Sequence, residues 1–482
     1  MVFSSYVFIL LFLPITLGGY YLLSFCRKSL FQRLFLIAAS LFFYAYFNVS
    51  YLLLIVASIA VNYVVAGRIQ KSSGAISKLF LTLGVLFNVG LLGYFKYYDF
   101  FVENINAVFG TDFALKHILL PLGISFFTFQ QLSFLVSVYR REENVEKLRD
   151  YSLFVTFFPQ LVAGPIVLYS EMIPQFKDET RRFFHPENFS AGIYMFSIGL
   201  FKKAVLADTL AYFADNGFGM TGLGLAAGWA TSLSYTLQIY FDFSGYSDMS
   251  VGLGKMFNID IPFNFLSPYR SESVSQFWRT WHITLGRALS TYIYRPLGGN
   301  RKGLPRTCVN LLLTFFVSGL WHGAAWTFVL WGTLHGVFVT LERILGLNKP
   351  KEGAPPRPLI RSLRILATFL IVNALWVLFR AESFAQAVEV YKGMIAVGNL
   401  GLSQLNTVVG QAARIDLPMP IDCAHIIALE SVLLFVVFAC RNSAAFLNRF
   451  TPSPKMLAAS IFLFTVAFLC LTRQSVFIYF NF

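Results

Sequence analysis

Six histidines are the side chains of this sequence best suited to proton transfer near neutral pH. His322 stands among two tryptophans and several small residues in the segment 319–326, inside a long apolar stretch. Ionisable side chains are costly at membrane depth, so one found there points to a function. A neutral imidazole at His322 can take a proton from a hydroxyl acceptor. The alternative is a histidine that bonds a backbone carbonyl at a helix break, and composition alone does not separate the two.

Two other histidines also stand in aromatic surroundings. His282 follows Trp281 in a basic segment (262–306), where an interfacial histidine without a catalytic role is the simpler interpretation. His335 comes thirteen residues after His322, which is not a metal-ligand spacing such as i, i+4. No cysteine or acidic residue stands at ligand spacing either, so we expect no metal site.

The segment 262–306 carries a concentrated positive charge, with seven basic residues against the single acidic residue Glu272. Tryptophan and tyrosine are interleaved with these charges, a composition typical of a membrane interface. We predict one or two amphipathic helices in the cytoplasmic leaflet. The charges can bind a polyanionic cytosolic ligand such as a phosphate-bearing cofactor, or anionic lipid head groups, which is the commoner outcome. The candidate ligand-binding residues are Arg279, Arg287, Arg295, Arg301 and Lys302.

Two further places carry polar or aromatic groups of interest. Asp242 and Asp248 follow an apolar run and can either line a polar cavity or cap helix ends. The segment 473–482 forms an aromatic tail. Such a tail either anchors in the membrane interface or docks back into the protein. Docking would place Tyr479 in a groove near the chemistry.

The elements that must position these residues are membrane-spanning helices. Of the 482 residues, 56% are hydrophobic and only 13% are charged, about half the charged fraction of an ordinary soluble protein. Disorder is excluded because it needs low hydrophobicity and high charge. Five scattered cysteines exclude a disulfide-stapled fold. We predict an all-α polytopic membrane protein with roughly 10–12 transmembrane helices plus re-entrant and interfacial helices, in a single domain over residues 1–482.

Lysine and arginine are distributed asymmetrically along the chain, whose net charge is +14. The basic clusters at 27–33, 68–78 and 140–149 alternate with apolar runs so that they fall on one side, as cytoplasmic loops do. This asymmetry makes the lipid bilayer, and not nucleic acid, the partner that the charge indicates. It also predicts that both termini are extracytoplasmic.

Two apolar stretches are expected to be broken. The stretch 151–169 contains Pro159, which removes a backbone donor and disrupts a helix. The stretch 309–341 is too long for one straight span. A break near Gly319 or Gly323 would give two short segments that meet inside the membrane. Non-helical backbone survives there only where protein or a water-filled cavity covers it.

An ordered set of motifs along nearly the whole chain resembles the membrane-bound O-acyltransferase family, and most closely its alginate O-acetylation branch. The motifs are residues 1–8, 93–97, 120–126, 164–165, 201–203, 240–248, 277–282, 297–301 and 319–323. The resemblance implies a ring of helices around a thinned centre, with a central tunnel from a cytoplasmic acyl donor to an outer acceptor. The family's invariant histidine matches His322, and its second conserved histidine matches His282. The candidate tunnel-lining residues are Asp242, Asp248, Trp321 and Trp326.

The resemblance also implies an activity, O-acetylation of an extracytoplasmic polysaccharide. We expect acetyl-CoA to be the donor substrate, docked at the basic cytoplasmic face near His282, and no tightly bound cofactor. His322 would be the general base. The tail is similar to the C-terminal aromatic motif of related systems, which implies that Tyr479 holds an acyl ester on the outer face. The chain lacks a Ser-His-Asp arrangement, which fits a separate extracytoplasmic O-acetyltransferase partner of the SGNH type.

Other functions and acceptors remain open at this point. A transporter or channel component of a polysaccharide export system is compatible with broken helices and with the charges of Lys202 and Lys203, although no inverted repeat is visible. A scaffold for such a system is a third reading. The acceptor can be alginate, cellulose, peptidoglycan or another exopolymer. The expected location is the bacterial cell (inner) membrane.

Overall fold

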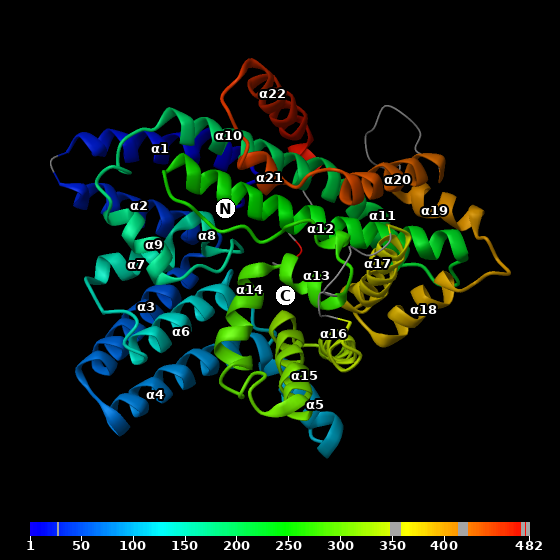
Figure 1. The fold of residues 1–482 in the computed structure, drawn as a ribbon, viewed down its shortest axis with the longest axis horizontal. Coiled ribbons are helices and arrows are strands. Elements are labelled where there is room, and N and C mark those ends of the chain that lie inside the picture. The colour runs from blue at the N-terminus through cyan, green and yellow to red at the C-terminus, as the bar shows by residue number, and fades with distance from the viewer. Residues whose placement is uncertain (27, 348–357, 413–422, 474–477, 479–482) are drawn as a thin grey trace. The chain divides into compact units, whose positions relative to one another are not determined.

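A computed structural model describes residues 1–26, 28–347, 358–412, 423–473 and 478, and every regular element in that part of the chain is helical (Figure 1). Seven of these helices are long and apolar enough to cross a membrane. They are Phe8–Phe25, Val49–Lys71, Gly74–Phe109, Pro186–Phe218, Gly303–His322, Pro358–Arg380 and Pro454–Thr472. Three shorter apolar helices accompany them, at Ser29–Ala45, Ile124–Tyr139 and Ala424–Ala439. The predicted all-α, polytopic membrane architecture is therefore confirmed, whereas the predicted number of spans stays a prediction.

The helices fall into two compact units, each of which is built from more than one stretch of chain. The first unit comprises Met1–Gly199, Tyr246–Phe263 and Phe450–Thr465, and the second comprises Leu200–Gly245, Asn264–Arg449 and Val466–Phe482. The helices that begin in the first stretch are α1 (Leu13–Leu22), α2 (Ser29–Ala45), α3 (Val49–Lys71), α4 (Gly74–Leu92), α5 (Tyr98–Phe109), α6 (Ile124–Tyr139), α7 (Leu148–Thr156), α8 (Phe158–Leu161), α9 (Tyr169–Lys177) and α10 (Pro186–Phe201).

The remaining helices follow from residue 208 onward. They are α11 (Asp208–Phe218), α12 (Leu225–Met256), α13 (Val274–Thr280), α14 (Ile283–Leu289), α15 (Gly303–His322), α16 (Trp326–Ile344), α17 (Pro358–Arg380), α18 (Phe384–Met394), α19 (Leu402–Ala412), α20 (Cys423–Ala439), α21 (Ser443–Leu447) and α22 (Pro454–Leu469). The prediction of a single domain over residues 1–482 stays a prediction.

A buried polar network joins helices of the first unit. Asn62 on α3 and Asn88 on α4 exchange side-chain hydrogen bonds at 3.2 and 2.6 Å. Gln131 on α6 continues the network by donating to Ser58 at 2.9 Å and by accepting from Tyr151 at 3.1 Å. Lipid offers no hydrophobic driving force between helices, so hydrogen bonds of this kind hold membrane helices together. Figure 1 shows α3, α4 and α6 side by side.

The structure corrects one of the expected element boundaries. The apolar run expected to end near Asp242 and Asp248 continues as one helix, α12, to Met256. Neither aspartate therefore caps a helix end. The polar and small residues of this stretch are poor helix formers, but local propensity is a weak guide where tertiary packing decides.

Both predicted helix breaks are present. The chain between α7 and α9 contains only the one-turn helix α8, and residues 162–168 are not helical. In the second unit, Gly323 is extended (φ −164°, ψ 153°) and separates α15 from α16. These two helices pack closely where Gly319 faces Gly332. The space there is so small that a Cβ atom on Gly332 would lie 2.4 Å from the Phe315 carbonyl oxygen. Small residues permit such close approach of membrane helices.

Candidate active site

The basic segment 262–306 forms short helices of the second unit. The helices α13 and α14 have seven residues each, and a π-helical turn, η6 (Ser290–Tyr294), follows before α15 begins at Gly303. One or two amphipathic helices were predicted here, and the structure has two short helices. Their placement in the cytoplasmic leaflet stays a prediction.

His282 occupies the tight connection between α13 and α14. Its backbone is left-handed (φ 45°, ψ 52°), a conformation that non-glycine residues rarely adopt and that is found disproportionately at functional sites. Asn264 secures the start of α14 by accepting from the backbone of Ile283 at 3.1 Å and from the Thr284 hydroxyl at 2.7 Å. The His282 side chain is fully buried, and this burial lowers its pKa to about 3. The imidazole is therefore neutral at physiological pH.

Histidine His322 ends α15, immediately before the break at Gly323. It is 2% exposed and lies in a cluster of aromatic rings, with the Trp331 centroid at 5.0 Å and the Phe379 centroid at 5.2 Å. Trp321 lies between the two predicted histidines, with ring centroids 4.9 Å from His322 and 6.0 Å from His282. The structure thus brings His282, His322 and Trp321 together, although 40 positions separate the histidines in the sequence. Their catalytic roles stay predictions.

A third buried histidine belongs to the same cluster. His335 on α16 is 0% exposed, and its Nδ1 accepts a hydrogen bond of 3.1 Å from the Trp278 indole N–H. Trp331 contacts both His335 and His322 with ring centroids at 5.0 Å. Sequence reasoning gave this histidine no role because its spacing from His322 fits no metal site. The signal that could have found it is the second tryptophan-rich segment, 326–331, one helical turn before it.

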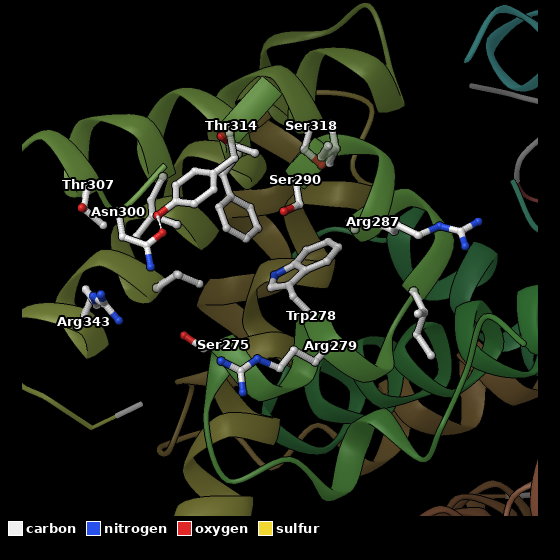
Figure 2. A pocket seen from close by; sticks show the side chains of 17 residues that line it. Ser275, Trp278, Arg279, Arg287, Ser290, Asn300, Thr307, Thr314, Ser318 and Arg343 are labelled. Carbon is white, nitrogen blue, oxygen red and sulfur yellow. Dashed lines mark hydrogen bonds between the residues drawn. The ribbon is translucent and has the colours of Figure 1, made fainter. Parts of the chain in front are cut away.

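A cavity of about 500 Å³ lies beside this cluster, between α13, α14, η6, α15 and α16 (Figure 2). Trp278 is central in the view, with Arg287 on one side and Arg343 on the other, and Arg279 below. Of the residues predicted to bind a polyanion, Arg279 and Arg287 line this cavity, and Arg295, Arg301 and Lys302 do not. Arg343 also lines the cavity but was not predicted to do so, because a single arginine after an apolar stretch is typical of the end of a membrane span.

Hydroxyl groups of α15 line one wall of the cavity. Thr307, Thr314 and Ser318 are spaced by seven and four residues, so they share one face of the helix. Thr307 and Thr314 donate to carbonyls one turn earlier, at 2.8 and 2.6 Å. Ser318 is fully buried, and its hydroxyl has no hydrogen-bond partner within the described ranges. Ser318 stands one turn before His322 and lines the cavity, so its hydroxyl can donate a hydrogen bond to a ligand bound there.

The four predicted tunnel residues lie elsewhere. Trp321 is buried between the histidines, and Trp326 is 54% exposed at the start of α16. Asp242 and Asp248 are buried in α12. None of the four lines the cavity of Figure 2, and their role in a tunnel stays a prediction.

Asp242 belongs to a buried ion cluster in the second unit. Lys203 Nζ lies 2.7 Å from Oδ1 of Asp208 and 2.7 Å from Oδ1 of Asp242, and all three side chains are at most 4% exposed. The other oxygen of Asp242 accepts a hydrogen bond of 3.0 Å from the backbone N–H of Ile478, which is itself buried. The tail therefore contacts α12 at Ile478. Tyr479, the predicted acyl carrier, lies outside the described residues.

Comparisons with known proteins find one matching family model and several similar bacterial proteins. The family model described as "MBOAT, membrane-bound O-acyltransferase family" matches residues 144–348. A peptidoglycan O-acetyltransferase of Helicobacter pylori is 42% identical over 524 aligned residues, covering all of this chain and 98% of the relative. A probable alginate O-acetylase of Pseudomonas aeruginosa is 42% identical over 84% of this chain and 77% of its own length. A teichoic acid D-alanyltransferase of Bacillus subtilis is 26% identical over 55% of this chain and 69% of its own length.

Proposed function

We infer the function from one premise, that this chain belongs to the membrane-bound O-acyltransferase family, and we propose that it passes an acetyl group across the membrane for O-acetylation of an extracytoplasmic polysaccharide. The chain is an acyltransferase, and relatives that match 84% or more of it are named for acetylation of peptidoglycan or alginate. The observation that carries the proposal is the arginine-lined cavity, whose α15 wall leads through Ser318 to His322.

The cavity has the chemistry expected of an acyl-donor site. Arg279, Arg287 and Arg343 supply positive charge for phosphate groups, and Trp278 supplies an apolar wall. A volume near 500 Å³ falls within the range of small-molecule sites. We propose acetyl-CoA as the donor because it combines phosphates, a thin polar arm and a thioester. It is a substrate in this scheme, and no tightly bound cofactor takes part.

His322 is the proposed general base, and His282 supports the same site. The acceptor hydroxyl gives its proton to the neutral imidazole of His322 while its oxygen bonds to the acetyl carbonyl carbon. The carbon–sulfur bond of the thioester then breaks, and the departing thiolate takes the proton from His322. The surrounding aromatic rings exclude water, which limits hydrolysis of the donor.

The first acceptor in this scheme is Tyr479, which would carry the acetyl group on the outer face. The buried contact between Ile478 and Asp242 supports a docked tail. An SGNH-type transferase outside the membrane would then move the acetyl group from Tyr479 to the polysaccharide. Peptidoglycan is the first polymer to test, since the relative named for it spans the whole chain. In cells lacking such a transferase, acetyl-Tyr479 should accumulate. Unchanged tail acetylation would contradict the partner step.

The chain is a multi-pass membrane protein, and we propose that it resides in the bacterial inner membrane with both termini outside the cytoplasm. The alternation of basic clusters along the sequence supports this orientation. A cysteine introduced at residue 2 should react with an impermeant thiol reagent in intact spheroplasts. Protection there would reverse the proposed topology.

The direct test uses purified protein and labelled acetyl-CoA. His322→Ala should abolish acetyl transfer while the protein still elutes as a folded species, whereas the exposed control His185→Ala should retain transfer. Transfer unchanged in His322→Ala would refute the base. Mass spectrometry of the C-terminal peptide should detect an acetylated Tyr479, and full activity in Tyr479→Phe would refute the relay.

A further inference from the structure

One wall of the cavity is a helix that is too short to be stable on its own. Helix α13 supplies Ser275, Trp278 and Arg279 to the cavity, yet it has only seven residues. A helix of two turns has little stability of its own. The orientation of its side chains therefore depends on its contacts with neighbouring residues.

The first contact between α13 and α16 is at the start of α13. The Glu342 carboxylate on α16 accepts hydrogen bonds from the backbone N–H groups of Val274 at 2.5 Å and Ser275 at 2.9 Å. These N–H groups have no partner inside the helix, and a negative charge at a helix N-terminus is favourable. Glu342 therefore fixes the beginning of α13 to α16.

The second contact between α13 and α16 is one turn further along α13. The Trp278 indole N–H donates to His335 Nδ1 at 3.1 Å, and the two rings meet edge to face with centroids 5.1 Å apart. Because Nδ1 accepts, the neutral imidazole of His335 carries its proton on Nε2. His335 and Glu342 are seven residues apart, so they stand on one face of α16.

We propose that His335 and Glu342 are positioning residues that hold Trp278 as a fixed wall of the donor cavity. This inference rests on the proposed function, in which that cavity takes the acyl donor. Trp278 also packs on Trp331 with centroids 5.7 Å apart, and Trp331 contacts His322. His322 is also held by Trp321 and Phe379, so we expect release of Trp278 to deform the cavity wall and to leave the base in place. The two residues therefore govern donor binding more than the proton transfer itself.

The test measures KM and kcat for acetyl-CoA with the full-length protein in membranes. His335→Leu removes the acceptor for the Trp278 indole, and we expect KM to rise about ten-fold, the cost of one buried hydrogen bond, with kcat changed less than two-fold. His335→Asn keeps a carbonyl acceptor near the position of Nδ1 and should recover most of the loss. A purely structural role would give neither the split between KM and kcat nor the rescue.

A double-mutant cycle tests whether the effect travels through Trp278. Trp278→Phe keeps an aromatic ring but removes the N–H, so His335→Leu should have little additional effect in that background. Additive effects of the two substitutions would overturn the proposal. So would a His335→Leu protein that loses kcat at unchanged KM.

The arginines separate failure of this inference from failure of the donor site. Arg287→Ala and Arg343→Ala should each raise KM for acetyl-CoA, since both guanidinium groups border the cavity. If neither does, the cavity is not the donor site and both proposals fall. If both do and His335→Leu does not, the donor site stands and the positioning role is wrong.

Discussion

The buried cluster of Lys203, Asp208 and Asp242 predicts which substitution in it should lower the stability of the protein most. Lys203→Met leaves two carboxylates buried without the cation between them, and loss of one partner of a buried ion pair costs about 3–5 kcal/mol. Asp242→Asn leaves the pair of Lys203 and Asp208 intact, and its amide oxygen can still accept from Ile478. Loss of one hydrogen bond to a charged group costs about 1.5–3 kcal/mol. We therefore expect Lys203→Met to be the more damaging by about 2 kcal/mol.

Thermal unfolding of the detergent-purified protein, followed by the fraction that remains monodisperse after heating, measures this order. The double variant Lys203→Met with Asp242→Asn should unfold at a higher temperature than Lys203→Met alone, because only one carboxylate then remains. The matched control is the partly exposed pair of Arg380 and Asp215, where Arg380→Met should cost about 1 kcal/mol or less. Equal losses in Lys203→Met and Asp242→Asn, or a double variant worse than either, would refute this account of the cluster.

Three further predictions concern the active-site region and the helix pair behind it. Ser318→Ala should lower kcat/KM for acetyl-CoA about ten-fold without changing the melting temperature, because its hydroxyl bonds nothing in the described structure; an unchanged kcat/KM would remove it from the site. Gly332→Ala should prevent close packing of α15 on α16 and lower the yield of folded protein, whereas Gly67→Ala, which has open space, should not. The buried neutral His282 has a lowered pKa, so the unfolded chain binds a proton below pH 6.5 that the folded chain excludes. Its contribution to stability is present above pH 6.5 and falls by about 1.4 kcal/mol at pH 5.5. The melting temperature of His282→Gln should fall less between pH 6.5 and pH 5.5 than that of the unsubstituted protein. An equal fall would contradict the lowered pKa of His282.

The parts of the site that could be predicted from sequence are those with a local signature. The break beside His322 follows from a stretch too long for one span and from Gly323 within it. Arg279 and Arg287 follow from the concentrated positive charge of the segment 262–306. These signals need no knowledge of which helices touch.

The parts that could not be predicted depend on tertiary contacts. Ser318 in an apolar run and Arg343 at the end of one have ordinary structural explanations until the cavity brings them together. Lys203 and Asp242 are 39 positions apart, and nothing in either segment indicates that they pair. The continuation of α12 through Asp242 was also hidden, because packing there outweighs poor helix propensity.

The π-helical turn η4 (Lys202–Ala207) has a consequence for how this chain tolerates insertions and deletions. Its wide turn lets the backbone N–H of Asp208 bond the carbonyl of Lys203, five residues earlier, and brings their side chains within 2.7 Å. Deleting one residue here would restore an ordinary α-helix and turn everything after it by about 100°. Lys203 and the aspartate would still share a face, because residues four apart do so in an α-helix, but the buried side chains of α11, such as Leu210 and Phe213, would turn away from their present neighbours. The packing of α11 therefore constrains the length of this turn, and relatives that bury the same side of α11 should also keep the extra residue.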